Sequence, residues 1–226
     1  MTKVFYIGDS TVQLNKIDTY PQTGMSQVLH LHMADHVQVL PHGKNGRSTK
    51  SFLEEGLFEP VRQGMGPGDF LLIQFGHNDE KPDELRHTEP FGSFQEYLMH
   101  YIRAAREAGA YPVLITPIAR RQFDETGAFR PGSHGEYPRA IRELGERERV
   151  PVADLTALTE SMVEKLGDER SKPLYVWPKD NTHLKYDGAV RMTGLLAREL
   201  AQSGAPYAQL LHRSGEEDPM VHFDCE

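Results

Sequence analysis

The chain has 226 residues, of which 38% are hydrophobic and 9% aromatic, as expected for one large α/β domain with a substantial core. Its 33 acidic and 25 basic residues give a net charge of −8, which argues against nucleic-acid binding because phosphate contacts require a basic face. The single cysteine, Cys225, excludes an intrachain disulfide and a cysteine-based zinc site, and no apolar run approaches the ~20 residues of a membrane-spanning helix.

Five short apolar runs have the length and the β-branched or aromatic content of buried strands. They are VFYIG (4–8), VQVLP (37–41), FLLIQFG (70–76), PVLITPI (112–118) and VPVADL (150–155). Three longer segments, 95–109, 137–150 and 187–204, carry the apolar spacing of amphipathic helices. Strands alternating with helices predict right-handed βαβ units, and therefore an α/β fold with helices on both faces of a parallel sheet of about five strands.

The chain is predicted to form a single domain over residues 1–210, followed by an acidic tail over 211–226, because no repeat, linker or second domain pattern interrupts it. The segments 81–90 and 131–138 are predicted to be surface loops. The first residues carry no basic stretch followed by a long apolar segment, so a cytoplasmic location is expected; the alternative is a secreted form with a trimmed leader.

The first apolar run stops abruptly on the sequence GDST, residues 8–11. Ligands of open parallel sheets bind beyond the carboxyl ends of the strands, so Ser10 is placed where such folds carry out chemistry. Gly8 permits a sharp turn, and the backbone amides after the serine can stabilise a developing oxyanion. Because Asp, Ser and Thr are also ordinary turn and N-cap residues, this motif alone does not decide between a nucleophile and a turn.

Two further loops follow predicted strands at the same edge of the sheet. In HGKNGRSTKSF (42–52) the spacing of a phosphate loop is absent, but the Gly46 amide can donate to an oxyanion, and Ser48 or Thr49 is expected to cap the next helix. In FLLIQFGHND the strand ends before Asn78, whose side chain offers two N–H donors. The alternative for Asn78 is an ordinary turn.

Asp180 and His183 lie three residues apart in KDNTHLKYDGA (179–189). In one helical turn this spacing sets both side chains on the same face. The carboxylate can then accept a hydrogen bond from Nδ1–H, which leaves Nε2 free to take a proton from a serine. The alternative is a salt-bridged surface histidine, but together with Ser10 the pair predicts nucleophilic catalysis.

These blocks resemble those of the SGNH, or GDSL-type, hydrolases, a family named for Ser, Gly, Asn and His in four separate blocks. In this chain they are Ser10 in GDST, Gly46 in NGRS, Asn78 in GHND and His183 in DNTH, over roughly residues 4–200. The resemblance implies a three-layer α/β/α sandwich with a parallel, flavodoxin-like sheet of order 2-1-3-4-5, and neither metal nor cofactor.

The resemblance also implies a role for each residue: Ser10 is the nucleophile, His183 the general base and then acid, and Asp180 orients His183. The Ser10 amide, the Gly46 amide and the Asn78 side chain form the oxyanion hole. The forms GDSTV, GRSTKSF, FGHNDEK and DNTHL look like the rhamnogalacturonan acetylesterase branch, which removes acetyl groups from pectic polysaccharide. The alternatives are an esterase for acetylated xylan or other small acetylated compounds, or a lipid esterase.

Several side chains near these blocks are candidates for substrate binding. Arg47, Arg120 and Arg121 can pair with uronate carboxylates. His77 flanks Asn78, and Trp177, the only tryptophan, either stacks on a sugar or packs against the core.

Two functions of other classes compete with the esterase. In a metal-dependent hydrolase, GHND and DNTH would supply ligands, but neither has the histidine spacing of a zinc site; HLH (30–32) is expected to pack within an amphipathic helix. A carbohydrate-binding or partner-binding domain without activity would have no use for Ser, Asn, Asp and His in these separate blocks. The expected partner is therefore an acetylated oligosaccharide or another small ester, with no nucleic acid and no membrane.

Overall fold

A five-stranded, all-parallel sheet forms the centre of the computed structural model, which describes residues 1–212 of the chain. The strands are β1 (Thr2–Gly8), β2 (Val37–Pro41), β3 (Phe70–Gln74), β4 (Tyr111–Ile115) and β5 (Val152–Ala153). Their spatial order is β2-β1-β3-β4-β5, the order that the family resemblance implied. Most of the predicted acidic tail, residues 213–226, lies outside the described residues.

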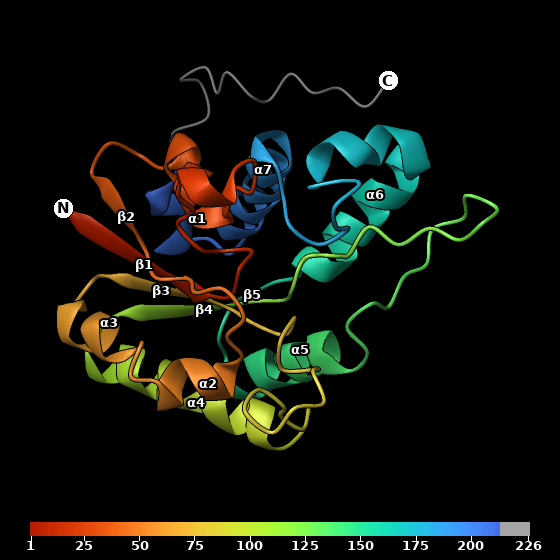
Figure 1. The fold of residues 1–226 in the computed structure, drawn as a ribbon. Helices are drawn as coiled ribbons and strands as arrows, with labels where there is room; N and C mark the ends of the chain where they lie inside the picture. Colours follow the sequence, from red (N-terminus) through yellow and green to blue (C-terminus); the bar gives the residue numbers. More distant parts are fainter. Residues whose placement is uncertain (213–226) are drawn as a thin grey trace.

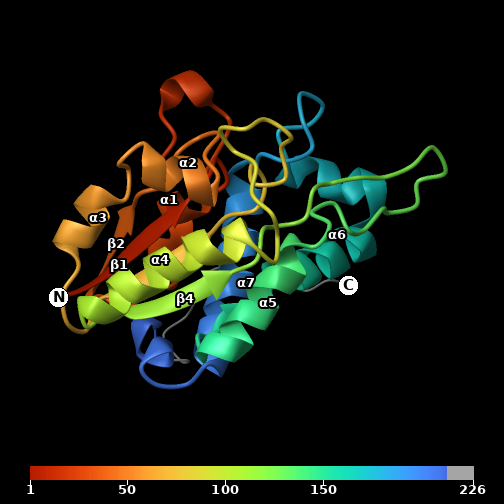
Figure 2. The same ribbon diagram turned by 90° about the horizontal axis from the view of Figure 1, so that it is seen from below.

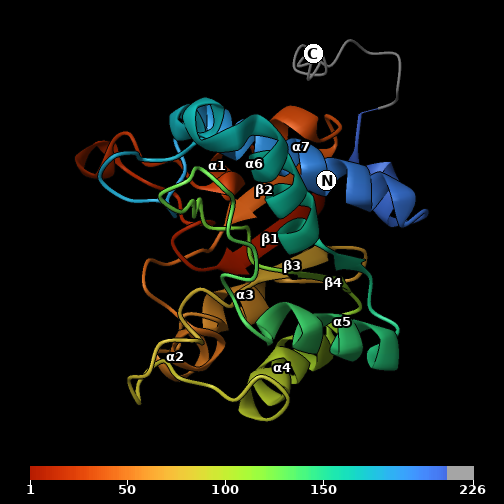
Figure 3. The same ribbon diagram turned by 90° about the vertical axis from the view of Figure 1, so that its right-hand side faces the viewer.

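Helices cover both faces of this sheet, so the fold is a three-layer α/β/α sandwich (Figure 1; Figure 3). One face carries α1 (Met25–Val28), α6 (Leu155–Ser171) and α7 (Tyr186–Gln202). The other carries α2 (Thr49–Glu54), α3 (Glu59–Gly64), α4 (Ser93–Glu107) and α5 (Tyr137–Glu148). Short 3-10 helices span Ile17–Thr19, Leu29–His32, Lys172–Leu174 and Tyr207–Leu210.

Strand β3 shows why an unbroken apolar run suits this architecture. All five of its residues are buried. Phe70 and Leu72 pack with the α1, α6 and α7 layer, whereas Leu71 and Ile73 pack with the α2 to α5 layer. A strand with helices on both faces favours apolar side chains at successive positions, so it reads as a nearly continuous run rather than an alternating one. The exception in β3 is Gln74, which is buried but accepts a hydrogen bond from the Tyr6 hydroxyl and donates one to the Thr11 hydroxyl.

The predicted strands and helices are mostly confirmed; the short helix α3 was not predicted, and the last strand and helix α6 also differ from the prediction. The last strand is only two residues long, because Asp154 follows it as the N-cap of α6 and accepts a hydrogen bond from the Ala157 amide. Helix α6 itself was not predicted: Thr159 occupies a fully buried position on it, and Gly167 interrupts it with a φ of +72°. Both features obscure the apolar period by which a helix is recognised.

The carboxyl ends of the strands meet on one side of the molecule. Gly8, Gln74, Ile115 and Ala153 are aligned across the sheet by its register. The loops that follow these strands gather on the side away from the N-terminus (Figure 2). Between β1 and β3 the chain order reverses, which is where ligands bind in such sheets. No helix of the described part of the chain is long and apolar enough to cross a membrane.

Candidate active site

The turn after β1 places Ser10 at this edge. Gly8 is required there because a Cβ atom would lie 2.5 Å from the Gln74 carbonyl oxygen. Asp9 fixes the turn: its Oδ1 accepts hydrogen bonds from the Thr11 amide at 2.9 Å and the Thr11 hydroxyl at 2.8 Å. The Asp9 backbone carbonyl accepts a further bond from the Val12 amide. A nucleophile held in this way loses little entropy on reaching its reactive position.

The loop between α6 and α7 carries Asp180 and His183, but it is not a helical turn. Oδ1 of Asp180 accepts hydrogen bonds from the backbone amides of Thr182 at 2.9 Å and His183 at 2.7 Å. Oδ2 of the same carboxyl lies 3.1 Å from Nδ1 of His183. The predicted proximity is therefore confirmed, while the helical reason given for it was wrong: the carboxylate itself organises a tight, non-helical turn.

His183 joins this loop to the nucleophile. Its Nε2 lies 2.9 Å from Oγ of Ser10, across 173 residues of chain. With Asp180 accepting from Nδ1–H, the tautomer that leaves Nε2 as acceptor is favoured. Burial raises the pKa of Asp180, but its bonds from the amides of His183 and Thr182 and from the imidazole outweigh this, so the pKa falls below its ordinary value. Asp180 is thus a carboxylate at neutral pH.

The predicted oxyanion donors lie in loops that are hydrogen-bonded to one another beside the Ser10 turn. Among the described residues no acceptor is found for the backbone amides of Ser10 and Gly46. Gly46 has a φ of +74°, a left-handed conformation that favours glycine. The Asn78 amide is oriented by two bonds: its Oδ1 accepts from Arg86 at 3.3 Å, and its Nδ2 donates to the Arg47 carbonyl at 3.1 Å. One Nδ2–H remains for a substrate oxygen.

The loop with Gly46 is fastened to the loops on either side of it. The Lys44 amide donates to the Gly8 carbonyl at 2.9 Å, and the Asn45 amide donates to Oε1 of Gln13 at 2.6 Å, both at the end of β1 or in the turn after it. On the other side, the Thr49 amide donates to Oδ1 of Asp79, in the loop after β3. Ser48 caps α2, as predicted, by accepting from the Ser51 amide. Three loops from three strands are therefore held in fixed relative positions, as a preorganised oxyanion hole requires.

Replacing Asn78 with alanine is expected to lower kcat for ester hydrolysis by about 10²–10³-fold while KM changes little, because a donor to the transition-state oxyanion is lost. Steady-state kinetics on a small acetyl ester measures both constants. Labelling by a fluorophosphonate checks that Ser10 and His183 still work together in the variant. Wild-type turnover in Asn78→Ala would contradict this role.

Asp79 is a buried carboxyl directly behind Asn78. Its Oδ1 accepts from the Thr49 amide at 3.0 Å and hydroxyl at 2.5 Å, and from the Thr88 hydroxyl at 3.1 Å. Oδ2 is buried and has no hydrogen-bond partner in the part of the chain that the structure describes. Burial raises the pKa of Asp79 to about 7, with a further increase from the charge of Asp9, although the bonds from the two threonines oppose the shift.

The raised pKa predicts a pH-dependent stability. Because the folded state holds the Asp79 proton to about pH 7 and the unfolded chain only to about pH 4, the free energy of unfolding falls as pH rises between these values. The contribution of Asp79 is on the order of a few kcal/mol. Urea unfolding at pH 5 and pH 7.5 should show a smaller difference in Asp79→Asn than in the wild type. An equal difference in both proteins would contradict this.

The side chains predicted to contact the substrate differ in how far they are already bonded to other groups of the protein. Arg47 donates twice to one oxygen of Glu55, at 2.9 and 2.7 Å. Arg121 is almost fully enclosed, pairs with Asp168 and lies 4.6 Å from the Trp177 ring, so its charge is used inside the protein. Trp177 itself is 41% exposed.

His77, also proposed as a substrate contact, is buried. Within residues 1–212 neither of its ring nitrogens has a hydrogen-bond partner, and the ring packs edge-on against His134 at 4.4 Å between centroids. Burial, followed by the charges of His134, Arg120, His183 and Lys81, lowers the pKa of His77 well below its ordinary value. His77 is therefore a neutral group enclosed beside the site.

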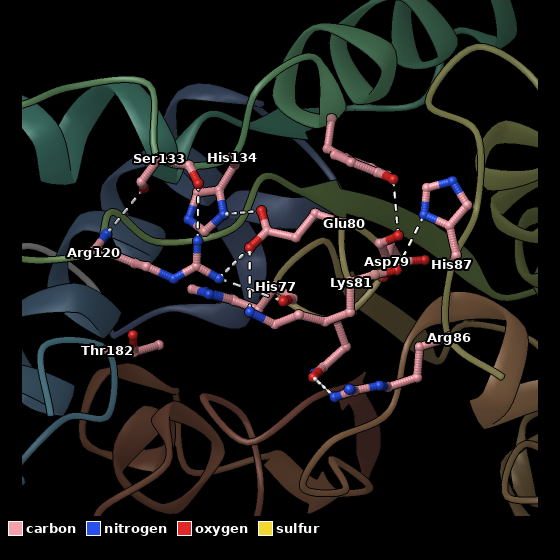
Figure 4. Close-up of polar contacts among 12 residues, drawn as sticks. His77, Asp79, Glu80, Lys81, Arg86, His87, Arg120, Ser133, His134 and Thr182 are labelled. Atoms are coloured by element: carbon pink, nitrogen blue, oxygen red, sulfur yellow. Dashed lines mark hydrogen bonds and ion pairs between the residues drawn. The ribbon is translucent and has the colours of Figure 1, made fainter. Parts of the chain in front are cut away.

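A network centred on Glu80 was not predicted from the sequence (Figure 4). One oxygen of Glu80 pairs with the guanidinium of Arg120, and the other lies 3.2 Å from Nδ1 of His134. Nε2 of His134 faces the Ile118 carbonyl at 2.8 Å. His134 lies in the segment predicted as a surface loop, yet it is buried, because the loop folds inward to reach Glu80. Arg120, the remaining predicted contact, donates to the Ser133 carbonyl at 2.9 Å.

Comparisons with known proteins identify the family of the chain. Residues 6–191 match the GDSL-like lipase/acylhydrolase family. The chain belongs to this family. It is 40% identical to rhamnogalacturonan acetylesterase RhgT of Bacillus subtilis (strain 168) over 228 residues, which cover 95% of this chain and 97% of that protein.

Two solved structures of related fold extend the comparison of this GDSL-like chain. The crystal structure of YxiM from Bacillus subtilis superimposes with a TM-score of 0.79 at 27% identity, covering 91% of this chain and 58% of that one. Axe2, an acetylxylan esterase from Geobacillus stearothermophilus, gives a TM-score of 0.63 at 17% identity, covering 89% and 93%, so it shares the fold. Within residues 1–212 no group of three or more His, Cys, Asp or Glu side chains is arranged to hold a metal ion.

Proposed function

We propose that this protein is a serine esterase that removes acetyl groups from carbohydrate, and that its substrates are acetylated rhamnogalacturonan oligosaccharides. The observation that carries the chemistry is the continuous path from Oγ of Ser10 to His183 at 2.9 Å and from His183 to Asp180 at 3.1 Å. The 40% identity to RhgT over nearly the whole of both chains supports the substrate class.

In the first step, Oγ of Ser10 attacks the acetyl carbonyl carbon while Nε2 of His183 accepts the hydroxyl proton. The carbonyl oxygen becomes an oxyanion, which accepts hydrogen bonds from the Ser10 amide, the Gly46 amide and Nδ2 of Asn78. When the tetrahedral intermediate collapses, the bond to the sugar oxygen breaks and that oxygen takes the proton from His183. The deacetylated sugar leaves and an acetyl ester remains on Ser10.

In the second step, His183 accepts a proton from water as the water oxygen attacks the acetyl carbon. The same donors stabilise the second tetrahedral intermediate. Its collapse breaks the bond to Oγ, Ser10 recovers its proton from His183, and acetate leaves. Asp180 stays ionised throughout and stabilises the imidazolium that forms in each step.

An esterase for acetylated xylooligosaccharides is the second candidate. The likeness to Axe2 at 17% identity shows the fold alone and adds nothing about substrate. A lipid esterase is disfavoured because Gly, His, Arg and Lys, rather than a long apolar series, fill the segments GHND and HGKNGRS beside the site.

Acetate release from three substrates tests the proposal: p-nitrophenyl acetate, acetylated rhamnogalacturonan oligosaccharides and acetylated xylooligosaccharides. We expect all activity to survive EDTA and to be abolished by a serine-directed fluorophosphonate, with kcat/KM highest on the pectic substrate. A higher kcat/KM on the acetylated xylooligosaccharides would favour the second candidate instead. Loss of activity with EDTA would contradict the serine mechanism.

A further inference from the structure

We propose that Lys81, supported by Glu80 and Arg120, forms a cationic subsite that binds the carboxylate of a uronic acid residue next to the acetylated hydroxyl. The inference rests on the proposed function, because rhamnogalacturonan contains galacturonic acid. The subsite would let the enzyme distinguish an acidic sugar chain from a neutral one.

The first argument is the local charge. Two permanent cations, Arg120 and Lys81, face the single carboxylate of Glu80, and Figure 4 shows them meeting at the same oxygen. His134 occupies the other oxygen at 3.2 Å. Since both oxygens of Glu80 are engaged and one negative charge offsets only one of the two cations, the cluster keeps a surplus positive charge at its surface.

The second argument identifies which cation is available. The Arg120 side chain is 12% exposed and donates to Glu80, the Ser133 carbonyl and the His77 carbonyl, so its guanidinium is largely satisfied. The Lys81 side chain is 42% exposed, and its Nζ lies 3.9 Å from Glu80, beyond hydrogen-bonding distance. Its ammonium group thus retains donors for an incoming carboxylate.

Two arginines beside the site provide the contrast. Arg47 is neutralised by Glu55, with which it makes two hydrogen bonds. Arg86 is neutralised by Asp83, to which it donates three. Lys81 differs from both arginines because its Nζ lies 3.9 Å from Glu80, too far for a hydrogen bond, and because Glu80 is already paired with Arg120.

The third argument is position. The Lys81 amide donates to the Asn78 carbonyl at 3.1 Å, which puts Lys81 one turn beyond the oxyanion donor. Arg120 bonds to the carbonyl of His77, and the amide of Arg121 donates to the Asn181 carbonyl at 2.8 Å, in the loop that ends with the catalytic histidine. These bonds connect the cluster to the loop of the oxyanion donor and to the catalytic loop, so the proposal places the bound carboxylate on the sugar that carries the acetyl group or on its neighbour.

Calorimetric binding tests this subsite independently of turnover. The ligands are deacetylated rhamnogalacturonan oligosaccharides, either as free acids or with every carboxylate methyl-esterified. We expect wild-type protein to bind the free acid about fivefold more tightly than the ester at low salt, with the preference reduced by added salt. Lys81→Met should remove the preference and Lys81→Arg should retain it.

Lys165→Met, at an exposed position on α6, makes the same change in net charge away from the site and should bind like the wild type. Equal binding of acid and ester by wild-type protein, absence of binding to either, or a preference that persists in Lys81→Met would overturn the subsite. The binding experiment requires no turnover, so it is independent of the test of the proposed function. If the proposed function is wrong, no acetate will be released from the acetylated oligosaccharides.

Discussion

Replacing Ser10 with alanine is expected to lower kcat for acetyl ester hydrolysis by about 10⁴–10⁶-fold. Without Oγ no acetyl-enzyme can form, and His183 is left with no hydroxyl to deprotonate. The residual activity comes from direct attack by water on the bound ester, which the oxyanion donors and substrate binding accelerate only modestly. The fold should be preserved, because the hydrogen bond to His183 is the only one made by the Ser10 hydroxyl within the described residues.

Acetate release from p-nitrophenyl acetate by wild type and variant, with thermal unfolding of both, measures this effect. Ser203→Ala is a matched control, because that hydroxyl lies just beyond α7 and donates only to the Glu199 carbonyl. A turnover within tenfold of wild type in Ser10→Ala would reduce Ser10 to a turn residue and remove the basis of the proposed mechanism.

The second large effect is expected for Asp180→Asn, which should lower kcat by about 10⁴-fold. The Asn Oδ1 can still accept the amides of Thr182 and His183, so the turn is retained. The Asn amide nitrogen, however, takes the place of Oδ2 and donates to Nδ1 of His183. The proton of the neutral imidazole is therefore forced onto Nε2, and a protonated Nε2 can no longer accept a hydrogen bond from the Ser10 hydroxyl.

Thermal unfolding separates this tautomer effect from damage to the fold. Asp180→Asn should unfold at nearly the same temperature as the wild type, because the turn keeps its backbone bonds, while its turnover is lost. Asn181→Asp is a useful comparison, because it alters charge in the same turn at a residue whose side-chain oxygen accepts from the Thr182 hydroxyl. If Asp180→Asn kept more than about one tenth of wild-type kcat, His183 would not depend on Asp180 for its orientation.

The fold was predictable because its strands are recognisable as short apolar runs. β2 matches its predicted range, and β1, β3 and β4 differ only at their ends. Burial on both faces of the central strands leaves few polar positions in them, so the apolar runs are recognisable in the sequence. Helix α6 was not predicted, because the hydroxyl of Thr159 bonds to the Leu155 carbonyl and accepts from the Ala119 amide, making a polar residue suitable for a core position.

The site was predictable in its residue types but not in its supporting contacts. Ser10, Asp180 and His183 follow from the chemistry that each side chain performs. A spacing of three is equally compatible with a helical turn and with a carboxylate-centred turn, and only the backbone bonds to Asp180 decide between them. The partners of Glu80 lie 40 and 54 residues away, and no local pattern reveals such contacts.

The placement of Asp180 and His183 in one short turn has a consequence for how the site can be switched. The acid–base pair is held together locally, by bonds between residues two or three apart, whereas a single contact to Ser10 spans 173 residues. If the turn swings outward as a rigid body, the imidazole keeps its carboxylate and loses only the hydroxyl. The distance between Nε2 and Oγ can therefore increase without separating the imidazole from its carboxylate, while the bond from the Arg121 amide to the Asn181 carbonyl keeps the turn attached to the loop that follows β4.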